Sequence, residues 1–412
     1  MIGRHTESMA HDPFTAGFSA SRDFDFEIRC VIGQAPSGSA DVGEVLAAVG
    51  SVKPGDHAGW FAAWTALADC VAGIARDAEG AGRRVTAADA WLRASTYYGT
   101  AVNAVASLPD EGELLPTFRK HRDAWDRWCD LVELDIERVE IPYEGGTMPG
   151  YLLRPAGPAQ TRPTLVGVNG SDGSLSAMWS SCAFGALRRG YQVLLFDGPG
   201  QQSMLFERDV PFRPDWEAVL TPVIDWLVGQ AATDPAAIAV YGISQGGYWV
   251  TRALAFEHRP AAAVVDPGVV DVSASWTAQI PKHLLGLLDA GKDAEFDRDM
   301  ALGMRLAKDA AHTWRFRARP FGADGYAAVL HAVEAYRADD VAARITTPLL
   351  ITDPEDEQFW PGQSERLHTL APAVSELARF TAAEGANQHC EPLARSLADA
   401  RIFDWLDARL GR

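Results

Sequence analysis

Hydrophobic residues follow two different periods along the chain, and the change falls near Leu134. From about Asp41 to Asp130, apolar residues recur at every third or fourth position, as in WFAAWTALADCVAGIARDAEGAG and VTAADAWLRASTYYGTAVNAVASL. That spacing is typical of amphipathic helices, and the glycines that close the first stretch are a common stop signal. The pattern therefore predicts an N-terminal helical domain over residues 1–133.

From Leu134 onward the pattern is that of strands. ELDIERVEIPY alternates apolar and charged residues, EGGTMPG supplies a turn, and YLLRPAG completes a predicted β-hairpin. Further on, short apolar runs alternate with helical segments, which indicates βαβ units and a mostly parallel sheet covered on both faces. The runs are TLVGVNG, YQVLLFDGPG, AAIAVYGIS, AAAVVDPG, TPLLITDPED and SELARFTAAEG. The predicted fold class is α/β, with residues 134–412 forming the sheet domain.

One connection within the sheet domain is unusually long. Roughly 75 residues separate AAAVVDPG from TPLLIT, far more than a simple crossover needs. The segment has a helical pattern and carries several aromatic residues, Trp276, Trp314, Phe316 and Tyr326 among them. Packing helices are one interpretation; we favour a helical lid over residues 270–345, inserted above the C-terminal edge of the sheet.

Composition and charge mainly exclude certain classes of binding partner. The 412 residues are 47% hydrophobic and 22% charged, and 37 basic against 55 acidic residues give a net charge of −18. Such an acidic chain is a poor ligand for nucleic acid or anionic membranes. No apolar run approaches the about 20 residues of a membrane span, and residues 1–14 lack the apolar centre of a signal peptide.

Metal and nucleotide motifs are also missing from the sequence. The five cysteines are scattered without C-x-x-C spacing, which suits free thiols in a reducing cytoplasm. No two histidines show H-x-x-x-H spacing, and the glycine turn DGPGQQS is not a phosphate loop because no Lys-Ser/Thr follows it. We therefore expect a cytoplasmic protein that acts on a small molecule, with no metal and no cofactor.

The stretch VYGISQGGYWV carries the strongest chemical signal. Ser244 follows a predicted buried strand and precedes a predicted helix, the context in which G-x-S-x-G forms a nucleophile elbow. The tight turn strains the serine backbone, so Gly242 and Gly246 must be small. The helix N-terminus also directs its free N–H groups toward developing negative charge. These features predict that Ser244 is a nucleophile.

A serine hydroxyl needs a base, and the base needs an acid to orient it. Of the ten histidines, His389 lies in a loop after the last predicted strand, where the chain order Ser, acid, His places the base. The acid should follow TPLLIT, in the loop DPEDEQFWPG. Asp356 is our choice there; Glu357 is its neighbour, and Asp266, after the preceding strand, is a rival.

Two fixed N–H donors are expected to stabilise the oxyanion intermediate. One is the backbone N–H of Gln245, the residue after the nucleophile. The other should come from the loop that follows VGVNG, from Ser171 or Asp172.

Taken together, GISQGG, DGPGQQS, TDPEDEQFW and EGANQHCE resemble the motifs of α/β-hydrolases. The helical stretch GDHAGWFAAWTALAD, with AADAWLRASTYYGTA, is similar to the group that includes bacterial 2,6-dihydroxypseudooxynicotine hydrolase, FrsA-like esterases and fungal yellowish-green polyketide-shortening hydrolases. The resemblance covers most of the chain and implies a triad of Ser244, Asp356 and His389. The chain departs from the family's DGPGQG turn at Gln202, where a glycine is usual.

The resemblance also implies a reaction and an assembly. Members of this group hydrolyse C–C bonds beside a ketone, or ester bonds, in aromatic or polyketide substrates, and they tend to form homodimers. We expect such a serine hydrolase here, with Tyr97, Tyr98 and Trp276, and also Trp60 and Trp64, as candidates to contact a planar, oxygen-rich substrate. A general carboxylesterase and a non-catalytic binding module on a hydrolase scaffold are the alternatives.

Overall fold

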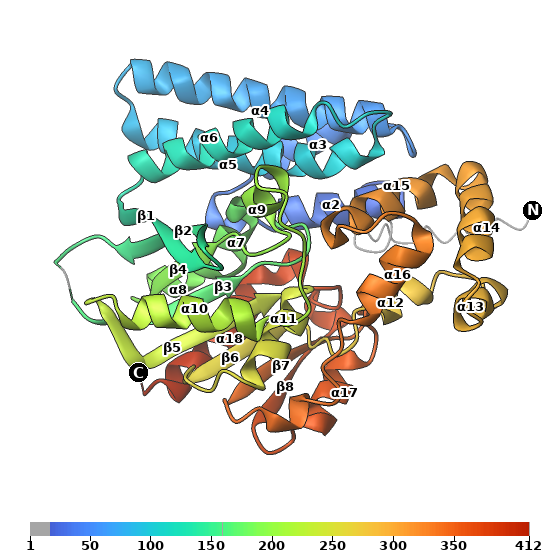
Figure 1. The fold of residues 1–412 in the computed structure, drawn as a ribbon. Helices are drawn as coiled ribbons and strands as arrows, with labels where there is room; N and C mark the ends of the chain where they lie inside the picture. Colours follow the sequence, from blue (N-terminus) through green and yellow to red (C-terminus); the bar gives the residue numbers. More distant parts are fainter. Residues whose placement is uncertain (1–16, 159, 412) are drawn as a thin grey trace, which may run out of the picture.

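The computed structural model describes residues 17–158 and 160–411, and its centre is one twisted sheet with helices on both faces (Figure 1). Within these residues the strand order is β1-β2-β4-β3-β5-β6-β7-β8, with an antiparallel hairpin at one edge and parallel pairing from β4 to β8. The strands are β1 Leu134–Tyr143, β2 Gly146–Pro155, β3 Arg162–Val168, β4 Gln192–Phe196, β5 Thr233–Ile243, β6 Ala262–Asp266, β7 Leu349–Pro354 and β8 Ser375–Phe380. The predicted α/β sheet and its leading hairpin are confirmed.

The N-terminal helices stack on one another above the sheet, at the top of Figure 1. They are α2 Arg22–Ile32, α3 Val42–Val49, α4 His57–Gly80, α5 Arg84–Ala104 and α6 Leu114–Leu131. Asp56 starts α4, because its carboxylate accepts a hydrogen bond from the N–H of Gly59 at 2.9 Å. The inward faces of these helices join one hydrophobic core with the helices on the adjoining face of the sheet.

The helix α4 is, among the described residues, the one that is long and apolar enough by length and composition to cross a membrane. Charged residues interrupt its apolar sequence, Asp69 and Arg76 among them, so α4 meets that measure without forming one continuous apolar run. The helix packs against α3 and α5, and its tryptophans Trp60 and Trp64 are buried. A helix that packs in a protein core meets the same criterion, so α4 by itself does not indicate a membrane span.

The helices that follow the sheet strands cover its two faces. On one side, α10 and α11 pack on β5 in a core that includes Trp216 and Trp249; on the other, α8 and α18 join the core shared with the N-terminal helices. These connecting helices are α7 Leu175–Met178, α8 Phe184–Arg188, α9 Gln202–Phe206, α10 Glu217–Val228, α11 Gly246–Leu254, α17 Gln363–Leu370 and α18 Arg395–Arg409.

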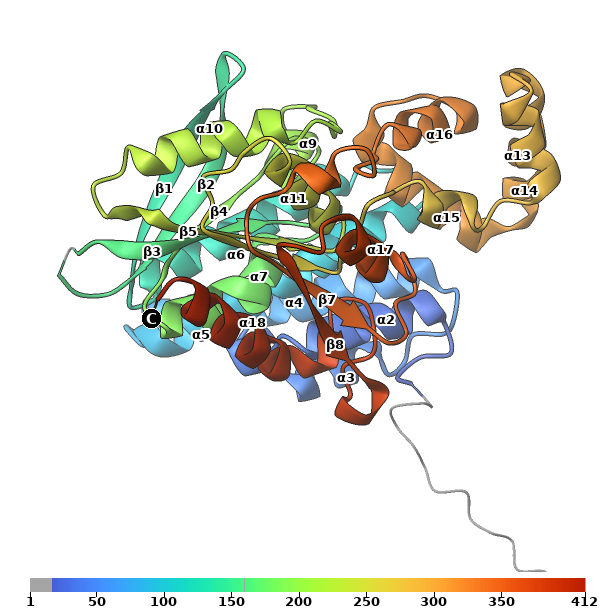
Figure 2. The same ribbon diagram turned by 90° about the horizontal axis from the view of Figure 1, so that it is seen from below.

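The long connection between β6 and β7 is helical, as its pattern predicts. It forms a separate arm that projects beside the N-terminal helices, drawn in orange in Figures 1 and 2. Its helices are α12 Ala274–Thr277, α13 Lys282–Asp289, α14 Asp293–Leu306, α15 Lys308–Ala318 and α16 Tyr326–Glu334. We refer to these helices as the lid helices.

Helix α2 is a feature that the sequence reading did not single out, although Phe24, Ile28 and Val31 recur at helical spacing and are buried. It lies between the other N-terminal helices and the sheet (Figure 1), and its C-terminal end packs against the short helix Pro392–Ala394, which precedes α18. At Gly33 a Cβ atom would lie 1.6 Å from the carbonyl oxygen of Pro392, so only glycine fits this contact. Its position places α2 close to His389.

Candidate active site

Ser244 lies in the tight turn between β5 and α11, as the sequence indicates. Its φ angle is 55°, a left-handed conformation that a serine adopts only under constraint from its surroundings. A Cβ at Gly242 would lie 2.3 Å from the carbonyl oxygen of Gly246, and one at Gly246 would lie 2.7 Å from that of Val168. The two glycines therefore allow the strained turn, and the turn holds the hydroxyl of Ser244 above the end of the strand.

His389 connects Ser244 to an acidic side chain. Its Nε2 atom lies 2.9 Å from Oγ of Ser244, and its Nδ1 atom lies 2.8 Å from Oε2 of Glu357. Both ring nitrogens thus have a partner, and the side chains of His389 and Glu357 are each 6% exposed. The three residues form one hydrogen-bonded chain from hydroxyl to imidazole to carboxylate.

The choice of Asp356 as the acid is wrong in this structure, because Glu357 occupies that place. Asp356 is exposed; it accepts a hydrogen bond from Nδ2 of Asn387 at 2.5 Å and donates its backbone N–H to Asn387 at 2.8 Å. Adjacent side chains of this turn point in different directions. The carboxylate of Glu357 therefore reaches His389, whereas that of Asp356 points toward Asn387. Asp356 instead connects the loop after β7 to the loop that carries His389.

The rival acid, Asp266, belongs to a buried network next to Ser244. Its carboxylate accepts hydrogen bonds from Tyr241 at 2.5 Å, from Thr352 at 2.8 Å and from Arg395 at 3.2 Å. Burial acts to raise the pKa of Asp266, but the charge of Arg395 and these hydrogen bonds hold it below its usual value. The backbone carbonyl of Asp266 accepts the N–H of Ser244 at 2.6 Å, so the network fixes the backbone of the turn that carries Ser244.

Electrostatics favours an ion pair between Glu357 and His389. Burial opposes a charged imidazole, but the nearby Glu357 carboxylate outweighs it, and the pKa of His389 is raised. Burial likewise opposes ionisation of Glu357, yet His389 and the N–H groups of Phe359 and Trp360 hold the pKa of that carboxyl below its usual value. A carboxylate that stays charged can stabilise the imidazolium that forms when His389 takes a proton.

The loop predicted to supply an oxyanion donor passes directly beside Ser244. A Cβ at Gly170 would lie 3.0 Å from Cβ of Ser244, so Ser171 follows at the point of closest approach. Gln201 fixes this loop, because its Nε2 donates to the carbonyls of Asn169 at 2.9 Å and Gly170 at 3.2 Å. Gln245 follows Ser244 and precedes α11. The roles of Gln245 and Ser171 as donors stay predictions.

Four of the five aromatic residues proposed to contact substrate are packed among the N-terminal helices. Tyr97 donates to Glu44 at 2.7 Å and Tyr98 to Asp69 at 2.5 Å, which holds both among the N-terminal helices. Trp60 and Trp64 pack edge to face with a centroid distance of 5.4 Å in the same core. Trp276, in contrast, belongs to the lid helices, and the guanidinium of Arg317 lies 4.5 Å from its ring centre.

The sequence reading did not identify the aromatic side chains that surround His389. Phe359 lies edge to face with the imidazole at 4.7 Å, and Trp360 lies at 5.7 Å. Phe26, on α2, lies 6.3 Å from the same ring and 5.7 Å from Phe359. Phe359 and Trp360 belong to the acidic loop DPEDEQFWPG, so the sequence could have indicated aromatic residues near the acid. The approach of α2, in contrast, is a tertiary contact between residues far apart in the chain.

Three charged side chains lie near this site, Glu27, Asp172 and Arg317; the sequence singled out only Asp172, and only as a possible backbone N–H donor. Burial, together with Asp172 and Asp23, raises the pKa of Glu27 to about 8. The surface of Asp172 stays accessible, but protein surrounds the carboxyl closely enough to raise its pKa, while His389 and Arg317 act in the opposite direction. Burial lowers the pKa of Arg317 to about 10, with Asp172 partly offsetting it.

With this fold and site, the chain belongs to the α/β-hydrolase family, whose model matches residues 165–396, and it is a hydrolase enzyme. It is 32% identical to hydrolase LUC6 of a Fusarium species, over 94% of this chain and 96% of that relative. It is 28% identical to 20-hydroxy-prefusarin hydrolase FUS2 of Gibberella moniliformis, over 94% and 97% of the two chains. The crystal structure of 2,6-dihydroxy-pseudo-oxynicotine hydrolase matches its fold with a TM-score of 0.70 at 22% identity, covering 92% of this chain and 95% of that one.

Proposed function

We propose that the protein is a serine hydrolase whose catalytic residues are Ser244, His389 and Glu357. The observation that carries the proposal is the continuous chain from Oγ of Ser244 through both nitrogens of His389 to Glu357, at 2.9 and 2.8 Å. Each distance lies within hydrogen-bond reach, which proton transfer between nucleophile and base requires. The left-handed φ of Ser244 supports it further, because such strain is characteristic of a nucleophile elbow.

The geometry favours a two-step acyl transfer. Oγ of Ser244 attacks a substrate carbonyl while Nε2 of His389 takes the hydroxyl proton, and Glu357 stabilises the imidazolium through Nδ1. The N–H groups of Gln245 and Ser171 stabilise the oxyanion. When the tetrahedral intermediate collapses, the bond to the leaving group breaks and His389 returns its proton to that group. Water then attacks the acyl-enzyme by the same route and releases an acid.

The substrate is a ketone or an ester of an aromatic or polyketide-type small molecule, cleaved at the C–C bond beside the ketone or at the ester bond. Arg317 supports an oxygen-rich substrate, because its guanidinium is half-buried near Trp276 and donates to Oγ of Ser275 at 2.7 Å. A half-buried cation favours a polarised or anionic oxygen, such as the enolate of a β-diketone. Glu27 is protonated below a pH of about 8 and can donate to another oxygen of the substrate.

The names of similar proteins are consistent with this class. One relative is a 20-hydroxy-prefusarin hydrolase, and the structural match is to a 2,6-dihydroxy-pseudo-oxynicotine hydrolase. Both names denote small molecules that carry hydroxyl groups. We extend that class of substrate to this chain as part of the proposal.

A fluorophosphonate probe tests the nucleophile directly. We expect the wild-type chain to become labelled and Ser244→Ala to stay at background, because the probe reacts only with an activated serine. Equal labelling of both would contradict the proposal and favour a binding module that lacks catalysis. Assays with β-diketones and with nitrophenyl esters then separate the two bond types, since a general carboxylesterase would turn over only the esters.

A further inference from the structure

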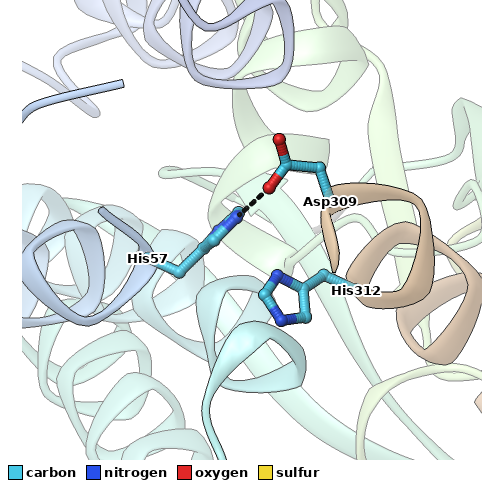
Figure 3. A group of neighbouring side chains, drawn as sticks. All are labelled: His57, Asp309 and His312. Carbon is cyan, nitrogen blue, oxygen red and sulfur yellow. Dashed lines mark hydrogen bonds and ion pairs between the residues drawn. The ribbon is translucent and has the colours of Figure 1, made fainter. Parts of the chain in front are cut away.

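Three side chains with metal-binding atoms come together where the N-terminal helices meet the lid helices (Figure 3). His57 is the first residue of α4, whereas Asp309 and His312 belong to α15. Nε2 of His57 lies 3.1 Å from Oδ1 of Asp309, and the ring centres of His57 and His312 are 4.4 Å apart. One ligand atom from each of the three residues lies within 4.8 Å of the others.

Local structure directs these side chains toward one another. Asp309 and His312 are three positions apart on α15, so they share one face of that helix. His57 is oriented from the opposite side, because its ring packs edge to face against Phe24 of α2 at 5.4 Å. The side chain of His57 is 16% exposed, while that of Asp309 is 77% exposed and leaves the cluster open to solvent.

We propose that His57, Asp309 and His312 bind a divalent metal ion of the zinc class. Two imidazoles and one carboxylate are a donor set that suits Zn²⁺ and similar ions, whereas Mg²⁺ and Ca²⁺ favour sites built from oxygen atoms alone. Ligands about 2.0–2.2 Å from a tetrahedral Zn²⁺ lie roughly 3.3–3.6 Å from one another, close to the 3.1 Å between His57 and Asp309. Solvent access at Asp309 leaves room for water as a fourth ligand.

The expectation of no metal site considered only histidine pairs on a single helix. The cluster joins residues 57 and 309, which are 252 positions apart in the chain, so no local spacing could indicate it. It brings together groups that only the fold places side by side.

A metal ion at this position would link the lid helices to the N-terminal helices. Two other contacts already join these regions, an ion pair between Arg319 and Glu111 and a hydrogen bond from Thr313 to Asp23 at 3.4 Å. Asp23 belongs to α2, the helix that also carries Phe26 toward His389. The ion would therefore hold the lid helices against α2 and α4, and its role is structural rather than catalytic.

Metal titration of the full-length chain, freed of metal with a chelator and then dialysed, tests the site. We expect one equivalent of Zn²⁺ by isothermal titration calorimetry, and visible absorption from bound Co²⁺. We expect His312→Ala and Asp309→Asn each to weaken binding by tenfold or more. Zn²⁺ should also raise the Tm of the wild-type chain and leave the Tm of both variants unchanged, since an ion stabilises the form that binds it.

His331→Ala is a matched control, because Nε2 of His331 makes a similar contact with Asp293 at 3.2 Å elsewhere among the lid helices. Cys70→Ser removes an exposed thiol that could bind Zn²⁺ by itself. Both controls should bind Zn²⁺ as the wild-type chain does. Absence of stoichiometric binding, or equal loss in His331→Ala or Cys70→Ser, would overturn the proposal, as would binding that His312→Ala and Asp309→Asn leave intact.

Discussion

The segment from β5 to α11 and the lid helices α13 to α15 differ sharply in how tightly they are packed. Around Ser244 most side chains of the strand and the helix are buried, Val240 and Val250 completely, and the glycines have no room for a methyl group. In the lid, Leu302 is 60% and Leu306 84% exposed. For the proposed hydrolase we expect a division of labour, in which the tightly packed segment positions the reacting groups and the loosely packed lid helices select what reaches them.

Loss of the base should have the largest effect. His389→Ala removes the group that takes the proton of Ser244, so we expect kcat/KM to fall by at least about 10⁴-fold. His258→Ala, an exposed histidine in hydrogen-bond contact with Thr346, should leave it unchanged. Steady-state assays with a nitrophenyl ester provide the comparison, and a loss of less than tenfold at His389 would remove it from the mechanism.

Glycine substitutions test the packing contrast itself. Gly242→Ala places a Cβ 2.3 Å from a backbone oxygen, so we expect a loss of about 3 kcal/mol or more in the free energy of unfolding. Gly286→Ala, on α13 with open space around it, should increase stability by up to about 1 kcal/mol. Chemical denaturation measures both; similar effects at the two positions would contradict the distinction between the tightly packed segment and the lid helices.

Arg317 tests whether the lid selects the substrate. Arg317→Met removes a donor to a charged oxygen, so we expect kcat/KM for a β-diketone to fall by about 10- to 100-fold. Turnover of a simple nitrophenyl ester should stay within about threefold, because that ester presents no such oxygen. Arg315→Met, exposed on the same helix, is the matched control. Equal losses for both substrates would show that Arg317 acts on the fold instead.

The pH profile should show the smallest effect. His389 must be neutral to act as a base, and its pKa is raised by Glu357, so activity is lost as the pH falls through that raised value. The acidic limb of kcat/KM should therefore have its midpoint above the usual value for histidine of about 6.5. Glu357→Gln removes the charge that raises this pKa, so the limb should move to lower pH. A wild-type midpoint below about 6 would contradict the assigned ion pair.

Much of the fold and part of the site could be predicted from the sequence. Ser244 and its glycines form a local motif, and the chain order places His389, because both depend on which element precedes and follows them. The acid was misplaced by one residue, since the direction of Asp356 depends on its bonds to Asn387, which lies on another loop.

Features made by contacts between distant segments could not be predicted from the sequence. Phe26 approaches His389 only because α2 packs against the loop that contains Pro392. Tyr97 and Tyr98 are aromatic residues on a helical pattern, and nothing in that pattern distinguishes a side chain in the core from one in a substrate site. Their partners Glu44 and Asp69 are themselves 53 and 29 positions away in the chain.

The rate of reaction with a nitrophenyl ester in Glu357→Gln and Asp356→Asn tests the central claim most directly. Both changes replace a carboxylate with an amide of the same shape, and they differ by one position in the chain. We expect Glu357→Gln to lose about 10³-fold or more in kcat, because the amide cannot stabilise the imidazolium of His389. Asp356→Asn should lose less than tenfold. The reverse order, or equal losses, would contradict a triad of Ser244, His389 and Glu357.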